Sequence, residues 1–287
     1  MTSKDWILVG LIVLYAAATL GLTELFRRKM KAAAVILILS LFTFPLWAEH
    51  RDSWFEWAKI LSVLLPTALL NFARIANFED RKGKVWELLK GPWLLWFFYG
   101  MLFVNITEAA LRDWQLGFYG NAIAGFALNA TIPFAPKFWR FDRRERGDLI
   151  VDFPMGWCLL YTTWNACFLF GSIPDEFAGG LAILLAAEFY SLVRRSDLYI
   201  MGRVYTLALF VLQLGCFDVL PGMDSSHWAN PVLANYWGLA NAALGFGYIL
   251  WYNWQMHTGR CDRVFRNPKT APLGEPAPAT RQAAAKR

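Results

Sequence analysis

The stretch WILVGLIVLYAAATLGLTELF (residues 6–26) is almost continuously apolar, and four basic residues follow it: Arg27, Arg28, Lys29 and Lys31. A helix of roughly 20 mostly apolar residues crosses a bilayer core that is about 30 Å thick. The stretch has no convincing small-residue cleavage site, and the basic residues behind it form a stop-transfer flank. We therefore predict that it is a membrane span and not a cleaved signal peptide.

The same pattern recurs eight more times along the 287 residues of the chain. The predicted spans are 6–26, 32–48, 56–73, 92–111, 117–135, 152–172, 177–193, 198–219 and 232–254. Only 17% of the residues are charged, against about 25% in soluble domains, and the mean hydropathy is +0.34. Because the nine spans leave no room for a soluble catalytic domain, we predict an all-α polytopic transmembrane helix bundle.

The basic residues indicate how this bundle is oriented. Of the 28 Lys and Arg residues, 23 fall in the breaks after the first, third, fifth and seventh spans and in the C-terminal tail. By the positive-inside rule, the N-terminus is then outside and the C-terminus is cytoplasmic. Since these residues are scattered over five cytoplasmic segments, they indicate membrane topology and no nucleic-acid partner. The predicted domains are a bundle over 1–258 and a basic, Pro/Ala-rich cytoplasmic tail over 259–287, whose composition is typical of disorder.

Polar side chains inside the predicted spans are the place to look for function, because they are costly in lipid and normally face the bundle interior. Asn105, Glu108 and Arg112 share one face of the fourth span, and Glu108 and Arg112 are spaced to pair. With the orientation above, several acids and amides lie toward the outside. We predict an outward-opening polar pocket formed by Asn105, Glu108, Asn121, Asn165, Asp218 and Asp224.

A second interpretation of the same residues is purely structural. Asn side chains form hydrogen bonds between membrane helices, which would explain each amide without a ligand. Glu188 and Arg203 lie near the cytoplasmic face, where they can pair across neighbouring spans or extend to the interface.

Several kinds of chemistry have no support in the sequence. The late spans contain no mid-span Lys for retinal, and His50, His227 and His257 lie at edges or in loops rather than as haem or di-iron ligands. Phosphate-loop, zincin and nucleophile-elbow motifs are missing. We expect no cofactor and no metal site.

The chain resembles a family of bacterial multipass membrane proteins that is catalogued only as a domain of unknown function. The resemblance lies in WFEWAK (54–59), NITEAALRD (105–113), NAIAG (121–125), TWN (163–165) and DSS (224–226), and it extends over nearly the whole chain apart from the tail. It implies a protein of the bacterial inner membrane. It implies no activity, substrate or catalytic residue.

Two functions of different class follow from the predicted pocket. The first is a transporter or binding protein for a small, partly apolar solute, with Glu108 and Asp218 as proton- or cation-coupling groups. The residues that would contact the solute are Asn105, Asn121, Trp164, Asn165 and Asp224. The second is a membrane-embedded enzyme acting on a lipid or isoprenoid, with Glu108 or Asp218 as a general acid that desolvation keeps protonated, beside Trp157 and Trp164.

The interior of the bundle distinguishes these hypotheses. A water-filled vestibule favours transport, and a pocket open only to lipid favours the enzyme. A packed interior in which Glu108 merely pairs with Arg112 excludes both and leaves a structural role. The expected partners are the lipid bilayer and a small-molecule or lipid substrate, while the sequence does not indicate an oligomeric state.

Overall fold

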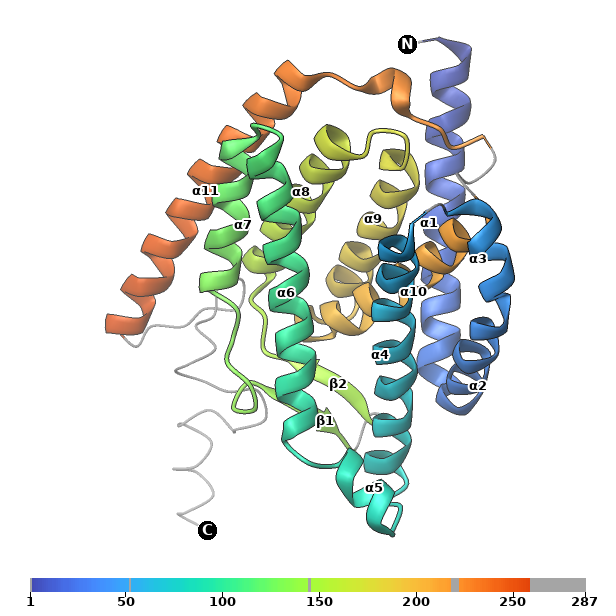
Figure 1. Cartoon of the computed structure of the whole chain (residues 1–287). Helices are drawn as coiled ribbons and strands as arrows, with labels where there is room; N and C mark the ends of the chain where they lie inside the picture. Colours follow the sequence, from blue (N-terminus) through green and yellow to red (C-terminus); the bar gives the residue numbers. More distant parts are fainter. Residues whose placement is uncertain (1, 52, 144–145, 218–221, 259–287) are drawn as a thin grey trace.

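The computed structural model describes all residues except 1, 52, 144–145, 218–221 and 259–287, and it is a bundle of helices that run up and down between two ends (Figure 1). Five helical stretches are long and apolar enough to cross a membrane: Ser3–Arg28, Met30–His50, Trp54–Phe78, Trp93–Gln115 and Ser196–Cys216. The apolar helix Phe177–Val193 is shorter. These stretches are what a membrane protein requires. The tail predicted over 259–287 lies outside the described residues.

Each of the nine predicted spans overlaps a helix, and the second overlaps two. The helices are α1 (Ser3–Arg28), α2 (Met30–Ser40) with α3 (Phe44–His50), α4 (Trp54–Phe78), α6 (Trp93–Gln115), α7 (Tyr119–Ala130), α8 (Met155–Ser172), α9 (Phe177–Val193), α10 (Tyr199–Cys216) and α11 (Pro231–Thr258). A short helix, α5 (Lys84–Leu89), lies in the connection between α4 and α6. Side-chain caps mark two of the helix starts: Thr2 and Asp5 form a capping box on α1, and Ser53 accepts from the Glu56 N–H on α4.

The prediction of an all-α bundle missed a hairpin in the connection between the predicted spans 117–135 and 152–172. Helix α7 ends at Ala130 and is only about 18 Å long, and Pro133 and Pro136 follow in a segment that cannot continue a helix. The chain then forms an antiparallel hairpin of β1 (Trp139–Asp142) and β2 (Asp148–Val151), with Trp139 opposite Val151. Strand β2 is buried along its whole length, so part of the predicted charged connection is a packed element of the fold.

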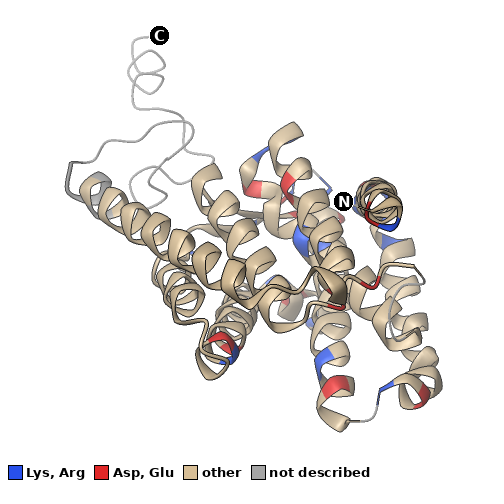
Figure 2. Ribbon diagram, turned by 90° about the horizontal axis from the view of Figure 1, so that it is seen from above, with Lys and Arg blue, Asp and Glu red and all other residues tan. Residues whose placement is uncertain are grey.

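One end of the bundle, which we call the basic end, brings together the breaks that are rich in Lys and Arg. Lys31, after α1, pairs with Glu79 at the end of α4 (2.7 Å), and Arg27 pairs with Asp148 of the hairpin (2.7 Å). Helix α5 and the hairpin also lie at this end (Figure 1). Figure 2 shows that charged positions occupy short stretches of otherwise uncharged helices.

The other end, which we call the opposite end, joins the breaks that are poor in Lys and Arg. Arg51, which precedes α4, pairs with Glu176 before α9 (3.6 Å). His227, in the connection before α11, lies 3.0 Å from Asp5 at the start of α1. The alternation along the sequence therefore corresponds to two ends of one folded bundle.

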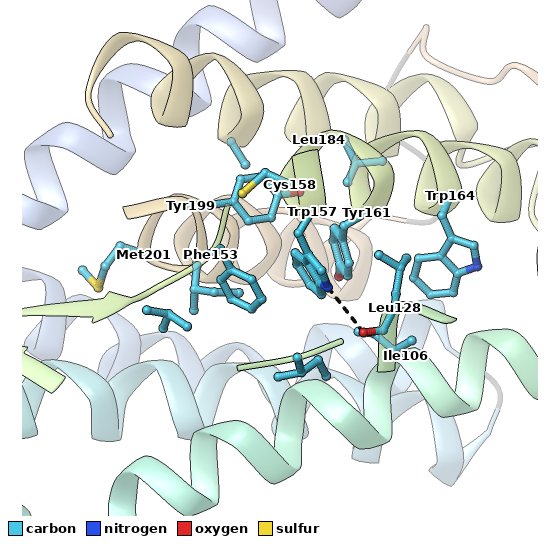
Figure 3. Close-up of a cluster of buried hydrophobic side chains, with 14 of the residues drawn as sticks. Ile106, Leu128, Phe153, Trp157, Cys158, Tyr161, Trp164, Leu184, Tyr199 and Met201 are labelled. Carbon is cyan, nitrogen blue, oxygen red and sulfur yellow. Dashed lines mark hydrogen bonds between the residues drawn. The ribbon is translucent and has the colours of Figure 1, made fainter. Parts of the chain in front are cut away.

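Packing is tight on one side of the bundle and open on the other. Helices α7 and α11 touch backbone to backbone, because a Cβ atom on Gly120 would lie 2.7 Å from the Gly238 carbonyl carbon. At the centre, the rings of Phe153, Trp157 and Tyr161 stack with centroids 4.0 and 5.3 Å apart (Figure 3). Helix α4 packs mainly on α2 and α10, and α6 packs mainly on α7. Side chains of α4 and α6 pack together at the basic end, in a cluster that contains Ala73, Ala76 and Leu94, and a cavity separates the two helices closer to the opposite end.

Candidate functional site

A cavity of about 450 Å³ lies between α4, α6, α8, α9 and α10. Its middle is apolar and is lined by Ile60, Val63, Phe168, Leu207 and Phe210. Along α10 the lining runs from Leu214, close to the opposite end, down to Arg203, about 16 Å deeper at 1.5 Å per residue. The cavity is therefore a deep shaft that starts at the opposite end of the bundle.

The mouth of the cavity is bridged by an ion pair between α4 and α6. The Lys59 Nζ atom lies 3.1 Å from the Glu108 Oε1 atom, and the two side chains are 43% and 39% exposed. The predicted pair of Glu108 with Arg112 is not what the structure contains. Arg112 instead donates from Nη2 to the Ser172 carbonyl oxygen at 3.3 Å, because its helix turns it toward α8.

A second, more buried pair lies at the same rim. The Arg51 Nη1 atom is 3.6 Å from the Glu176 Oε1 atom, and Arg51 also donates from Nε to the Leu214 carbonyl oxygen at 2.8 Å. Burial raises the pKa of the Glu176 carboxyl, and the neighbouring Arg51 guanidinium opposes that rise. The charges at the mouth are thus largely matched by one another.

The inner end of the cavity, which we call the floor, is polar. Ser62 and Asn105 reach it from α4 and α6, Tyr161 from α8 and Arg203 from α10. The same four residues also line a smaller cavity of about 80 Å³, which continues toward Leu149 and the hairpin at the basic end. The floor therefore separates the large cavity from a narrow inward extension.

Arg203 carries the charge of this floor. Its side chain is only 6% exposed, yet its Nε and Nη1 atoms are buried without a hydrogen-bond partner among the described residues. An isolated guanidinium is costly inside a membrane protein, where low dielectric penalises an unpaired charge. One interpretation of the sequence was that Arg203 extends to the membrane interface. In the structure it is buried in the wall of the cavity instead.

The acid predicted to pair with Arg203 has other partners. Glu188 on α9 accepts from the Thr162 hydroxyl at 2.7 Å and from Ser191 at 3.4 Å. Thr162 in turn lies 2.9 Å from the Tyr199 hydroxyl. This hydrogen-bonded group satisfies Glu188 and leaves the two Arg203 nitrogens without an acceptor.

Four of the residues predicted from the sequence line the cavity: Asn105, Glu108, Trp164 and Asn165. Asn165 donates to the Tyr161 hydroxyl at 3.3 Å. The indole of Trp164 is turned into the core, where its Nε1 atom donates to the Asn121 carbonyl oxygen at 2.9 Å. Trp164 therefore contributes apolar surface to the cavity wall, and its N–H is not available to a solute. Figure 3 shows Tyr161 and Trp164 side by side on α8.

Asn121 is not among the residues that line the cavity. It is 1% exposed, and its amide donates to Asp113 at 2.6 Å and to the Trp164 carbonyl oxygen at 3.2 Å. Its own side-chain oxygen accepts from Asn241 on α11 at 2.9 Å. This is the interhelical role that the structural interpretation expected for the amides.

Asp224 is also not among the residues that line the cavity. Asp224 is exposed in the connection before α11, where the backbone N–H of Ser226 donates to it at 2.8 Å and lowers the pKa of its carboxyl. Asp218 lies outside the described residues. Sequence reasoning missed Ser62 and Tyr161, and it set Arg203 aside because of its position near a helix start. A lone arginine inside an apolar span was the signal that could have identified the floor.

Among the residues that the structure describes, no group of three or more His, Cys, Asp or Glu side chains is placed to hold a metal ion. Comparisons with protein-family models, curated proteins and solved structures give no match. The resemblance found in the sequence therefore stays a prediction, and the cavity itself is the basis for assigning a function.

Proposed function

We propose that this chain is a nine-span protein of the bacterial inner membrane, with its N-terminus outside and its C-terminus in the cytoplasm. In this orientation the cavity opens to the outside, and it binds a small, partly apolar solute as part of a transporter or binding protein. The observation that carries this proposal is the cavity of about 450 Å³, apolar along its middle and polar at both ends.

Two features support nine crossings. Helix α9 is apolar but has only 17 residues, and both α8 and α9 are mostly buried between other helices, so they need less apolar surface than a helix that faces lipid. Short α7 is flanked by α6 and α11, which shield it where it does not reach across the core. The grouping of the basic breaks at one end supports the orientation, because positive loops are retained in the cytoplasm.

The size and lining of the cavity support a small solute. Pockets that hold small ligands are roughly 300–1,000 Å³, mostly apolar, with a few polar groups that fix orientation. The middle of this cavity offers the apolar wall, and the floor offers Asn105, Tyr161 and Arg203 as polar groups. An open interior of this kind also argues against a role that is only structural.

The enzyme hypothesis has less support. A general acid at neutral pH needs a desolvated carboxyl, but Glu108 is 39% exposed and forms an ion pair with Lys59. The other candidate acid, Asp218, lies outside the described residues. We therefore favour binding or transport over chemistry on a lipid.

Cysteine accessibility tests whether the cavity opens outward. In a protein with Cys216 and Cys261 replaced by Ser, Asn165→Cys places a thiol on the cavity wall, and Ala166→Cys places one on the buried side of the same helix turn. A sulfonated, membrane-impermeant maleimide added outside intact cells is expected to label Asn165→Cys. Ala166→Cys is the matched control and is expected to stay unlabelled. Labelling of Asn165→Cys only in inverted vesicles would overturn the proposed orientation.

A metabolite comparison separates the function classes. A strain that lacks the protein is complemented with the wild type or with Asn165→Trp, which fills the cavity. Transport or solute binding predicts that a small solute changes its distribution between cells and medium in the Asn165→Trp strain. A change confined to the structure of membrane lipids would instead support the enzyme, and identical profiles in all strains would contradict both.

A further inference from the structure

The charges of the cavity are matched at its mouth and unmatched at its floor. At the mouth, Lys59 faces Glu108 and Arg51 faces Glu176. The four described acids that line the cavity, Glu56, Glu108, Asp175 and Glu176, all belong to the helix ends or connections at the opposite end. The floor has one cation, Arg203, and no described acid beside it in the lining.

Arg203 is also prepared for a ligand by its geometry. Two of its nitrogens are buried without an acceptor, and the side chain is more than nine-tenths buried in the wall of the cavity. The guanidinium is planar and always charged, and its N–H groups match the two oxygens of a carboxylate or phosphate. A solute with one such group would supply the acceptors that the protein does not.

The neighbours of Arg203 at the floor are neutral and can donate hydrogen bonds. The Asn105 amide forms no hydrogen bond with the described residues, and Tyr161 has a hydroxyl that already accepts from Asn165 and still has its proton to donate. Donors beside a cation favour an anion, since they add charge-assisted hydrogen bonds to the same oxygens. A cationic solute would find no opposite charge among the described residues of the floor.

We infer that the solute is an amphipathic anion, with a carboxylate or phosphate monoester head bound to Arg203 at the floor and an apolar body packed against Phe168 and Phe210. This inference rests on the proposed function, since it names the chemical class of solute that the cavity takes. Arg203 is the residue that selects the charge, and Asn105 and Tyr161 are its hydrogen-bonding partners.

Protection of a cavity thiol tests the inference in phosphatidylcholine nanodiscs. The rate at which neutral N-ethylmaleimide modifies Asn165→Cys is measured with octanoate, octyl phosphate, octanamide or octylammonium present. We expect octanoate and octyl phosphate to protect at roughly 10- to 100-fold lower concentration than octanamide, which has the same shape without the charge. Octylammonium is expected to give no protection.

Variants of Arg203 identify the group that sets this preference. In Arg203→Met, octanoate and octanamide should protect equally. In Arg203→Lys the preference should persist but weaken, since the ammonium lacks the two-pronged geometry. Lys59→Met, at the exposed rim, is the matched control and should keep the wild-type preference within about threefold, because solvent screens that charge. All Arg203 and Lys59 variants are made in Asn165→Cys, and if Arg203→Met does not fold, Asn165→Cys with Arg203 intact and with Arg203→Lys decide the question.

The failures of the two proposals are distinguishable. Equal protection by octanoate and octanamide in Asn165→Cys with Arg203 intact overturns the anion inference and leaves the solute-binding cavity intact. Protection by none of the four probes overturns the proposed function as well. Nanodiscs that contain phosphatidylglycerol identify the source of the anion: slower modification that depends on Arg203 means that a lipid head group supplies it, and an unchanged rate means a free solute.

Discussion

Arg74 and Arg203 are two arginines buried in the same bundle, and the protein treats them in opposite ways. Arg74, on α4 at the basic end, is 0% exposed and lies 2.8 Å from Asp148. It also donates to the Arg27 carbonyl oxygen at 2.8 Å and to the Tyr205 hydroxyl, and its Nε atom alone is without a partner. Asp148 is further paired with Arg27. Arg74 therefore has an acid on β2 and hydrogen-bond acceptors on α1 and α10 as partners.

Arg203, on α10 at the cavity floor, has no such set of partners. Two of its nitrogens lack acceptors, and the nearby acid Glu188 is bound to Thr162 and Ser191. A buried charge is normally tolerated only when an opposite charge or hydrogen-bond acceptors pair with it. The contrast therefore separates Arg74, which stabilises the fold, from Arg203, which we propose binds a ligand. The following predictions test that distinction, from the largest expected effect to the smallest.

Removing Arg74 should be strongly destabilising. Arg74→Met leaves Asp148 with Arg27 as its remaining cation in a buried site, and breaking a buried pair costs about 3–5 kcal/mol. The free energy of unfolding, measured by denaturant titration in detergent micelles, should fall by that amount. Arg81→Met is the control, since Arg81 is 42% exposed and surface pairs contribute about 0–1 kcal/mol. A loss below about 1 kcal/mol in Arg74→Met would remove the contrast.

Removing Arg203 should increase the stability of the protein when no solute is bound, which is the opposite of the effect expected for Arg74. An arginine at the centre of a membrane helix costs about 2.5–3.5 kcal/mol. Arg203 is buried but lies only one turn into α10, so Arg203→Met should raise the free energy of unfolding by a smaller amount, roughly 1–2 kcal/mol. The same denaturant titration measures it. Lower stability would mean that Arg203 has a partner within the folded protein, and Arg203 would then be structural like Arg74.

The rim pair should matter little for stability. Lys59→Met and Glu108→Gln each remove one partner of a pair that is 43% and 39% exposed, and exposed pairs contribute about 0–1 kcal/mol. A double-mutant cycle on the two residues should give a coupling energy within that range. A coupling energy above about 2 kcal/mol would exceed the usual value for surface pairs. It would mean that this ion pair contributes substantially to holding α4 and α6 together.

Glu176 at the rim should show a small dependence on pH. Because burial raises the pKa of its carboxyl in the folded state, the folded protein binds a proton at a higher pH than the unfolded chain. Stability should therefore rise as pH falls through the raised pKa toward the unfolded value of 4.5. The Tm of the wild type against pH should show this rise, and Glu176→Gln should flatten it. An unchanged profile in Glu176→Gln would assign the pH dependence to another group.

The architecture was largely predictable because it rests on local properties. Hydropathy predicted the apolar helices, including the five helical stretches that are long and apolar enough to cross a membrane, and the alternation of basic breaks matches the two ends of the bundle, since both depend only on residue type and distance along the chain. The hairpin was missed because residues 136–151 were assigned to a charged connection between two spans. Nothing local shows that Leu149, Ile150 and Val151 pair with the strand that starts at Trp139.

The site was predictable only in part. Asn105, Glu108, Trp164 and Asn165 line the cavity in the structure, as expected for polar and aromatic residues of spans that face the interior of a bundle. Their partners were not predicted, because helical spacing gives neighbours on the same helix only. Glu108 was thus matched to Arg112 on its own helix, while its partner in the structure is Lys59 on α4.

The sequence by itself determined that the chain forms apolar helices in a fixed order with alternating basic breaks, since hydrophobic length and charge position are properties of each segment alone. Only the tertiary structure decided which buried arginine has an acid and hydrogen-bond acceptors beside it. This pairing depends on which helices and strands pack together. Asp148 pairs with Arg74 because the hairpin packs against α4. Arg203 instead lines the cavity between α4, α6, α8, α9 and α10. The same residue type therefore acquires a structural role in one place and a proposed binding role in the other.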